Sequence, residues 1–180
     1  AMTRSSPRRQ AGRLGFSIVE LMATLAVLAI LLAVGIPSFS EFTVNYRTTA
    51  QANDLLADLA FARMESFKLG RTVEVSAEGG VWEDGWRVGV DLNTDGDIGD
   101  TGELLRQHGA AEQDFTIEAL DGTGAAFTRT AFDGTGARTV PADANNAEVA
   151  ICRPDGDEAK SRWVAIAATG RAEARKDVTG

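Results

Sequence analysis

One long apolar run near the N-terminus dominates the pattern of hydrophobic and polar positions along this chain. From Phe16 to Ile36 the sequence reads FSIVELMATLAVLAILLAVGI, and Glu20 is the only charged residue in the run. A helix rises about 1.5 Å per residue, so a helix of this length spans about 30 Å, the thickness of the hydrocarbon core of a bilayer. The pattern therefore predicts a membrane-spanning helix over residues 16–36.

The residues after this run continue as a helix with one apolar face. After Pro37 no proline occurs until Pro141, and Gly70 is a typical stop signal for a helix. Apolar residues recur at spacings of three and four, at Leu55, Leu56, Leu59, Ala60, Ala62, Met64 and Phe67. We therefore expect one long helix from Ile18 to Lys68, kinked at Pro37, whose amphipathic half over residues 37–69 packs on a sheet.

Beyond Gly70 the pattern changes to short apolar runs between glycine and aspartate clusters. The chain contains 19 glycines, which suits antiparallel strands joined by tight turns. Five runs are predicted as strands, and two further runs carry a weaker strand pattern. The five are Arg71–Ala77, Trp86–Asp91, Phe115–Leu120, Ala147–Cys152 and Trp163–Ala168, and the two weaker runs are Leu104–His108 and Gly124–Phe132. We expect an α+β fold in which residues 70–180 form a β-rich globular domain, with 141–146 as a loop and 173–180 as a mobile tail.

The charges at the N-terminus orient the apolar helix. Residues 1–15 contain four arginines and no acid, and they lack apolar periodicity. Positive charge on this side predicts that the N-terminus stays in the cytoplasm and that the body lies outside the inner membrane. Without residues 1–15 the chain is four charges more negative than its net −8, which disfavours general binding of nucleic acid.

Neither a secretory signal nor a plain membrane anchor fits the apolar run fully. A cleaved secretory signal has an apolar core of about 7–15 residues and then a small-residue cleavage site, and no such site precedes Pro37. A plain membrane anchor explains the length and the flanking charge of the run. It gives no reason for Glu20, because a carboxylate inside lipid is costly and needs a partner.

The residues Leu14-Gly15-Phe16-Ser17-Ile18-Val19-Glu20-Leu21 resemble the class III signal of type IV pilins and type II secretion pseudopilins. The resemblance implies that a prepilin peptidase removes residues 1–15 as a leader, cuts between Gly15 and Phe16 and methylates the new N-terminal phenylalanine. It also implies that the apolar segment forms the core of a helical filament, in which Glu20 pairs with the N-terminal amine of a neighbouring subunit. Such pairing relieves the cost of burying both charges. A helix-kinking proline at the position of Pro37 is common in these proteins.

Motifs in the body resemble the GspH/FimT family, the H-type minor pseudopilins of type II secretion and the related minor pilins of type IV pili. The motifs are Ala62-Arg63-Met64-Glu65-Ser66, Gly85-Trp86-Arg87-Val88, Asp91-Leu92-Asn93-Thr94-Asp95-Gly96, Leu104-Leu105-Arg106, Ile151-Cys152-Arg153-Pro154-Asp155-Gly156 and Ala168-Thr169-Gly170-Arg171. The resemblance covers nearly the whole mature chain. It implies a structural subunit that sits at or near the filament tip, helps to initiate assembly and contacts other minor subunits.

An acidic loop is a candidate calcium site. Its sequence D-x-N-x-D-G-D has closely spaced oxygen ligands and a glycine at the sixth position, and the ligands would be Asp91, Asn93, Asp95 and Asp97. The twelfth position is Gly102, and a glutamate follows one residue late, at Glu103. Because the flanks are predicted strands and not helices, we favour a solvated hairpin loop over calcium binding.

Basic residues near the C-terminus are a candidate DNA-binding site. In some FimT-like pilins a C-terminal glycine-arginine-x-arginine motif binds DNA, so the resemblance makes Arg171, Arg175 and Lys176 candidates. Here the sequence is Gly170-Arg171-Ala172-Glu173-Ala174-Arg175, in which the second arginine is displaced and a glutamate intervenes. A few phosphate contacts give weak, salt-sensitive binding, so a solvated tail is the favoured interpretation.

The sequence contains no recognisable catalytic motif, so we expect no enzymatic activity and no cofactor. His108 is the only histidine, and the chain has no nucleophile elbow, P-loop or CxxC pair. Cys152 is the only cysteine and is expected to be a small buried apolar side chain. The aromatic residues Trp82, Trp86 and Trp163 are expected in the core or on a sheet face.

Three hypotheses for the function remain. The leading one is a minor pseudopilin of the bacterial inner membrane that assembles with other pseudopilins or pilins through its N-terminal helix. The second is a type IV minor pilin that captures DNA for natural transformation. The third is an inner-membrane-anchored sheet domain unrelated to filaments. Substitution of Gly15 distinguishes the third, because a plain anchor needs no cleavage there.

Overall fold

The structure is a computed structural model that describes residues 15–93, 97–111, 114–143 and 145–176, and only the backbone of Pro37. The chain divides into two compact units, Ala1–Phe42 and Thr43–Gly180. Helix α1 (Ile18–Leu69) begins in the first unit and ends in the second, and the strands all belong to the second. The predicted helix from Ile18 to Lys68 is thus confirmed to within one residue. Because the helix is unbroken in secondary structure through Pro37, the kink there stays a prediction.

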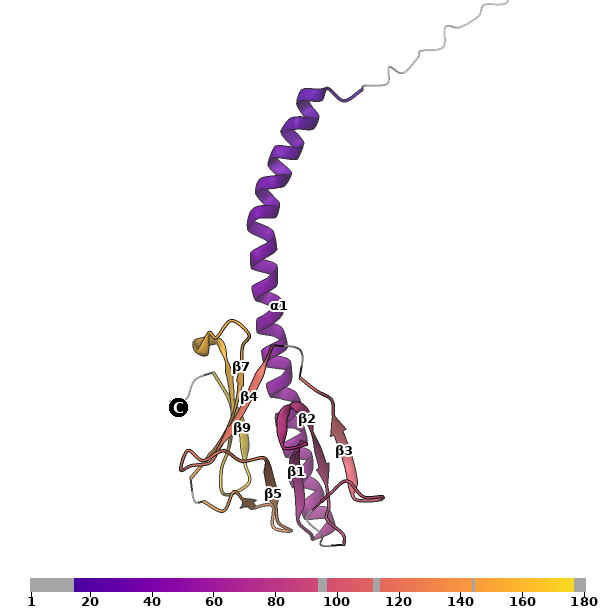
Figure 1. The fold of residues 1–180 in the computed structure, drawn as a ribbon, viewed down its shortest axis with the longest axis vertical. Coiled ribbons are helices and arrows are strands. Elements are labelled where there is room, and N and C mark those ends of the chain that lie inside the picture. Colours follow the sequence, from indigo (N-terminus) through magenta and orange to yellow (C-terminus); the bar gives the residue numbers. More distant parts are fainter. Residues whose placement is uncertain (1–14, 94–96, 112–113, 144, 177–180) are drawn as a thin grey trace, which may run out of the picture. The chain divides into compact units, whose positions relative to one another are not determined.

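Two antiparallel sheets form the β-rich part of the second unit (Figure 1). The five-stranded sheet has the order β3-β2-β1-β5-β6, with β1 (Val73–Glu78), β2 (Val81–Gly89), β3 (Leu104–His108), β5 (Arg129–Phe132) and β6 (Arg138–Val140). The four-stranded sheet has the order β4-β7-β8-β9, with β4 (Thr116–Leu120), β7 (Ala147–Cys152), β8 (Arg162–Ile166) and β9 (Ala172–Arg175). A short 3-10 helix, η1 (Glu158–Lys160), connects β7 to β8. The α+β class is confirmed, but the chain builds two sheets where one was expected.

One hydrophobic core joins the C-terminal part of α1 to both sheets. The helix contributes Ala52, Leu55, Leu59 and Ala62. The sheets contribute alternate residues of their strands, among them Val73, Val75, Trp86, Val149, Ile151 and Ile166. Since successive side chains of a strand point to opposite faces, each sheet turns one face to this core. The predicted packing of the amphipathic half of the helix on a sheet is therefore confirmed.

The buried face of α1 is narrower than the predicted apolar stripe. Three members of that stripe are exposed: Ala60, Met64 and Phe67. The buried positions recur at spacings of three and four and end at Ser66, whose hydroxyl donates to the carbonyl of Arg63 (2.7 Å). A serine is tolerated on the inward face because it can bond to its own helix. Position along the helix, more than residue type, therefore decides which side chains are buried.

Strand bounds differ from prediction mainly where distant pairing decides them. The bounds of β3 and β7 are as predicted, but residues 173–175, predicted as part of a mobile tail, belong to β9. This strand pairs with β8, which aligns Trp163 with Arg175 and Ile166 with Ala172. The edge of an existing sheet can recruit a segment that has no strand pattern of its own. β6 was not predicted, and β5 is shorter than the predicted run over residues 124–132.

Candidate functional site

The predicted processing site lies in an exposed, non-helical segment directly before α1. Gly15, Phe16 and Ser17 are all exposed. Ser17 caps the helix, since its carbonyl accepts the amide of Leu21 (3.0 Å) and its hydroxyl oxygen accepts the amide of Val19 (3.3 Å). A Cβ added at Gly15 would meet no atom within 4 Å. Packing among the residues that the structure describes therefore does not require a glycine here.

Glu20 lies in the first turn of α1, where the helix dipole favours a carboxylate. It lines a shallow groove of about 420 Å³ on one helix face, together with Ala23, Thr24, Val27, Leu28 and Leu31. The hydroxyl of Thr24 donates to the carbonyl of Leu21 (2.8 Å), so this polar group is satisfied within the helix. Glu20 is the ionisable group of this face, and the small side chains beside it leave room for a second helix.

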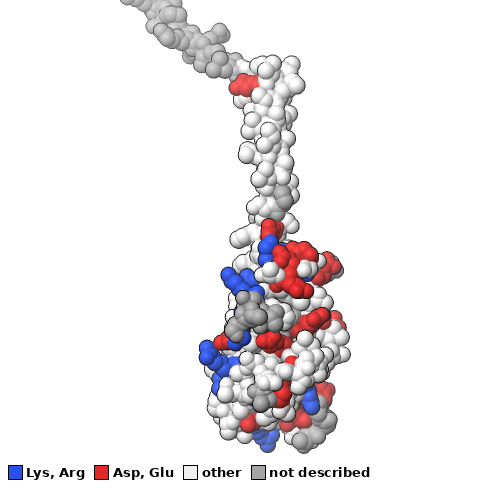
Figure 2. Space-filling model, turned by 90° about the vertical axis from the view of Figure 1, so that its left-hand side faces the viewer, with Lys and Arg blue, Asp and Glu red and all other residues white. Residues whose placement is uncertain are grey.

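The large apolar side chains in the first part of α1 are uncovered. Between Phe16 and Ile36 each of them is 49–78% exposed. Figure 2 shows this stretch as almost entirely uncharged surface. Among the described residues, α1 is long and apolar enough to cross a membrane, judged by length and composition. Apolar surface is unfavourable in water by about 25 cal/mol per Å², so lipid or other helices must cover this stretch.

Of the candidate DNA-binding residues, Arg175 lies on the edge strand β9, Arg171 directly precedes the strand and Lys176 directly follows it. Arg171 and Arg175 both contact Glu173, through an ion pair of 3.3 Å from Arg171 Nη2 and a hydrogen bond of 2.8 Å from Arg175 Nε. The hydrogen bond from Arg175 lowers the pKa of Glu173 below its ordinary value. Glu173 is therefore ionised at neutral pH and offsets one of the two guanidinium charges. Lys176 is exposed at the end of the strand.

The acidic loop is organised by its own hydrogen bonds. The side chain of Glu103 is buried, and its Oε1 accepts the amides of Leu92 (2.8 Å) and Asn93 (3.2 Å). Asp97 Oδ1 accepts two amides that follow it in the chain (2.8 and 3.1 Å), while Asp95 lies outside the described residues. Among the described residues, no three acidic, histidine or cysteine side chains are placed to hold a metal ion. Calcium binding stays the less favoured hypothesis for this loop. The sequence did not reveal that Glu103 holds the loop through its hydrogen bonds to these two amides.

Comparison with known proteins decides the family. A profile of the family described as type II transport protein GspH matches residues 51–170, two thirds of the chain. The chain belongs to the GspH family. Two crystal structures of the type IV minor pilin FimU from Pseudomonas aeruginosa, each 23% identical, share its fold. The first has a TM-score of 0.56, and the match covers 74% of this chain and 92% of FimU. The second has a TM-score of 0.54, and the match covers 71% of this chain and 91% of FimU. No curated protein matches the chain.

Membership of the GspH family gives the chain the role of a minor pseudopilin or pilin subunit. Its family and fold are those of structural subunits and not of enzymes. The resemblance to GspH/FimT proteins and the pilin-like fold, both expected from the sequence, are confirmed. The family match ends at Gly170 and begins after the apolar run. Processing at Gly15 and Phe16, pairing through Glu20 and DNA binding on β9 therefore stay predictions.

One set of GspH-like motifs forms a contact between α1 and two turns. Arg63 donates from Nε to the carbonyl of Gly136 (2.9 Å) and from Nη2 to the carbonyl of Thr169 (2.9 Å). Gly170 has a φ of +79°, and a Cβ at this residue would collide with the Gly136 carbonyl. The motifs around Arg63 and Gly170 are thus the two sides of one contact, which brings the five- and four-stranded sheets together at the helix.

A second GspH-like contact joins α1 to β2 and β3. The side chain of Asp58 is 6% exposed; its Oδ2 accepts the indole N–H of Trp86 (2.9 Å), and its Oδ1 accepts a guanidinium N–H of Arg106 (2.6 Å). The ring of His108 stacks on Trp86 with centroids 4.0 Å apart and planes 2° apart. Gly85 has a φ of +108°, and a Cβ there would collide with the backbone of His108 and Gly109, at the end of β3. The sequence did not reveal Asp58, because an acid on a helix usually faces water.

A third contact explains the motif that follows β7. Arg153 is buried and donates to Asp155 from Nε (2.9 Å) and from Nη2 (2.5 Å), and also to the side-chain oxygen of Asn45 on α1. The hydrogen bonds from Arg153 lower the pKa of Asp155 to about 2. Cys152 is half-buried, where full burial was expected, and burial raises the pKa of its thiol.

Proposed function

We propose that this chain is made as a precursor and cleaved between Gly15 and Phe16, with methylation of the new N-terminus. Residues 16–36 then hold it in the bacterial inner membrane, with the N-terminus cytoplasmic and the body, residues 37–180, in the periplasm. There it becomes a minor subunit of a type II secretion pseudopilus or a type IV pilus and helps to initiate assembly at the filament tip. The uncovered apolar surface of the first part of α1, in which the Glu20 carboxylate is the only charged group, is the observation that carries the proposal.

The chemistry of this surface favours assembly through a neighbouring subunit. Cleavage before Phe16 creates a new ammonium group four residues before Glu20. When helices leave the lipid and bundle, an unpaired carboxylate among apolar side chains is costly, and an ammonium from a neighbour offsets that cost. Ala23 and Thr24 beside Glu20 allow a neighbouring helix to approach closely. The same charge pair would also fix the axial position of one subunit against the next.

Processing and assembly can be tested separately in a host that supplies a prepilin peptidase and partner subunits. Gly15→Leu should leave the precursor uncleaved in intact-mass analysis, while Gly35→Leu, a matched glycine in the apolar run, should be cleaved normally. Glu20→Gln should be cleaved but should not crosslink to partner subunits in the membrane. Thr24→Val, on the same helix face, should crosslink like the wild type. Normal function of uncleaved Gly15→Leu would identify a plain membrane anchor and refute the proposal.

DNA capture is the alternative function, and the exposure of Arg171 is the observation in its favour. The side chain of Arg171 is 75% exposed directly before the edge strand β9, and Lys176 is exposed directly after it. Full chain in detergent should then bind duplex DNA at low salt, and Arg171→Ala/Arg175→Ala should abolish that binding. Glu173→Gln should strengthen it, because both arginines lose their carboxylate partner. Arg129→Ala, an exposed arginine on another strand, is the control, and absence of binding at low salt refutes this alternative.

A further inference from the structure

The outer edge of β3 is open to a further strand. β3 ends the five-stranded sheet, and β2 is its one neighbour among the described strands (Figure 1). Its residues from Leu104 to Gln107 are all exposed, and His108 is half-buried. Two of them, Leu104 and Leu105, are large apolar residues that are 40% and 38% exposed. An exposed edge with apolar side chains is a template for pairing with another chain.

The pairing with β2 shows which backbone groups of β3 point to this edge. The amide of Val90, directly after β2, donates to the carbonyl of Glu103, directly before β3 (2.9 Å). Backbone groups alternate in direction along a strand, so Val88 also points to β3, where it is paired with Arg106. The next residue of β3, Gln107, therefore points its N–H and its carbonyl to the outer edge. Neither group has a hydrogen-bond partner among the described residues.

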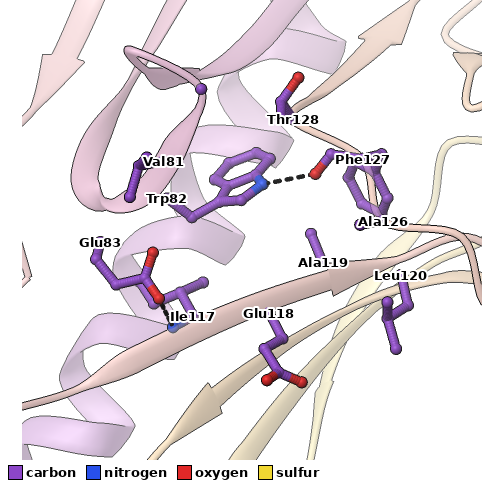
Figure 3. Close-up of a pocket in the computed structure, with 11 residues that line it drawn as sticks. Val81, Trp82, Glu83, Ile117, Glu118, Ala119, Leu120, Ala126, Phe127 and Thr128 are labelled. Atoms are coloured by element: carbon purple, nitrogen blue, oxygen red, sulfur yellow. Dashed lines mark hydrogen bonds between the residues drawn. The ribbon is translucent and has the colours of Figure 1, made fainter.

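The edge of the four-stranded sheet at β4 is covered instead (Figure 3). There Glu83 Oε1 accepts the amide of Ile117 (2.9 Å). The carbonyl of Ala119 accepts the amide of Phe127 (3.0 Å), so a further segment of the chain already lies beside the strand. The protein thus closes one edge strand with its own groups and leaves another open.

The charge at the open edge favours an acidic partner. The side chain of Arg106 is 44% exposed, and its guanidinium lies over the ring of Phe61, 4.0 Å from the centroid. It donates from Nη1 to Asp58 Oδ1 (2.6 Å), and its other N–H groups have no partner among the described residues. A strand added to β3 places one residue opposite Arg106, where a carboxylate would accept these N–H groups.

A second copy of the chain fits this edge less well than an acidic segment does. Two β3 strands that overlapped fully in antiparallel pairing would place the two copies of Arg106 opposite each other. Like charges directly opposite each other destabilise a strand pair. The exposed Leu104 and Leu105 favour apolar residues beside the acid, because such residues would cover them.

We infer that the outer edge of β3 binds an extended segment of a partner protein, and that this segment carries an aspartate or glutamate between apolar residues. The segment accepts a hydrogen bond from the Gln107 amide and donates one to the Gln107 carbonyl. Its carboxylate faces Arg106, and an apolar neighbour contacts Leu105. The site uses none of residues 16–36, which are proposed for assembly in the membrane, so it can be tested independently of that proposal.

A defined peptide tests the inference on full chain in detergent. The probe is fluorescein-labelled Thr-Val-Glu-Val-Thr with an amidated C-terminus, and fluorescence anisotropy measures its binding. Gln107→Pro removes the outward amide and places the proline ring at the edge, but it leaves the hydrogen bonds to β2 in place. This variant should weaken binding at least about tenfold, whereas Gln107→Ala, which keeps the amide, should weaken it less than about threefold.

A change of charge in the probe tests the acidic character of the partner. Thr-Val-Lys-Val-Thr should bind at least about tenfold more weakly, because Arg106 repels its ammonium group. The chain has a net charge of −8, so non-specific attraction would favour the lysine peptide. A preference for the glutamate peptide would therefore come from the local charge at this edge.

Several results would overturn the inference. No binding of the glutamate peptide at about 1 mM, or equal loss in Gln107→Pro and Gln107→Ala, would exclude this edge as its site. Equal affinity for the lysine peptide would exclude the acidic partner. Dimerisation of the full chain that Gln107→Pro abolishes would make a second copy the occupant. Circular dichroism checks that Gln107→Pro is folded; should it not be, a probe with all its backbone amides methylated decides, since its undiminished binding would exclude strand addition.

Discussion

Replacing Asp58 with alanine tests whether the polar contact between α1 and the five-stranded sheet stabilises the fold. The carboxylate accepts from the indole of Trp86, which is 1% exposed, and from Arg106, whose side chain is 44% exposed. In Asp58→Ala the Trp86 N–H loses its partner inside the core. Arg106 also loses its ion pair, but its guanidinium can turn to water. The two consequences therefore differ in cost.

The expected magnitude follows from that difference. A buried donor left without an acceptor costs about 1–3 kcal/mol. Loss of an ion pair on the exposed side costs about 0–1 kcal/mol. Asp58→Ala should therefore lower the free energy of unfolding by about 2–3 kcal/mol, or the Tm by about 6–12 °C for a body of this size. Arg106→Met removes the ion pair and the contact with the Phe61 ring (4.0 Å), and it leaves the buried Asp58 carboxylate without its cationic partner, so it should cost at least about 3 kcal/mol.

Urea unfolding of full chain in detergent, followed by tryptophan fluorescence, measures these changes. Asp54→Ala is the matched control, because it removes an exposed carboxylate one turn earlier on the same helix and should change stability by less than about 0.5 kcal/mol. The reasoning fails if Asp58→Ala costs no more than Asp54→Ala.

Three further outcomes are expected in the same body. Gly170→Ala combines a positive φ (+79°) with a collision against backbone, so in urea unfolding it should lower the free energy of unfolding by more than about 2 kcal/mol. Gly156→Ala, at a φ of +70° with open space around it, should lower it by about 1 kcal/mol. Arg153 lowers the pKa of Asp155 from 3.8 to about 2. The contribution of this pair to the free energy of unfolding should therefore be complete above about pH 4 and lost as the pH falls through 2. In an acid titration of stability, Asp155→Asn should remove this pH-dependent part. Because burial raises the pKa of Cys152, iodoacetamide should alkylate it more slowly than glutathione at about pH 8, until denaturant removes the difference.

The helix was predictable because its signals are local. An uninterrupted apolar run, the lack of proline after Pro37 and the stop at Gly70, which has a φ of +61°, fix its bounds without reference to the sheets. β9 shows the opposite case. Its sequence, Ala-Glu-Ala-Arg, favours a helix or a solvated tail, and it becomes a strand because the edge of β8 is available. The division into two sheets likewise depends on pairing between segments far apart in the chain.

Some local structure could have been predicted from a repeat. The pentapeptide Asp-Gly-Thr-Gly-Ala occurs at residues 121–125 and 133–137, and both copies form the same turn. In each, one aspartate oxygen accepts the threonine hydroxyl (2.6 Å) and two backbone amides, at 2.9 Å and 2.9 Å for Asp121 and at 2.8 Å and 3.1 Å for Asp133. These hydrogen bonds lower the pKa of both aspartates. Aspartate and glycine at these positions are typical of such turns, so the repeat predicts them.

The candidate site was predictable only as far as its motifs are contiguous. Gly15, Phe16 and Glu20 lie within six residues of one another, and the structure leaves all three exposed, as a site for other proteins requires. The pairing of Glu173 with both arginines was not predictable, because it depends on β9 being a strand that places alternate residues on one face.

Three polar contacts hold α1 in a defined position against the sheets. They involve Asn45, Asp58 and Arg63, which span about 27 Å of helix at 1.5 Å per residue. Apolar contacts are not directional, so a core alone would resist sliding of the helix only weakly. A shift by one turn, about 5.4 Å, would break all three polar contacts at once. The three contacts connect the helix to β2 and β3, to the end of β7, and to the turns at Gly136 and Thr169. A force on the helix is therefore transmitted to both sheets together. A subunit that is held in a filament by its helix needs this coupling.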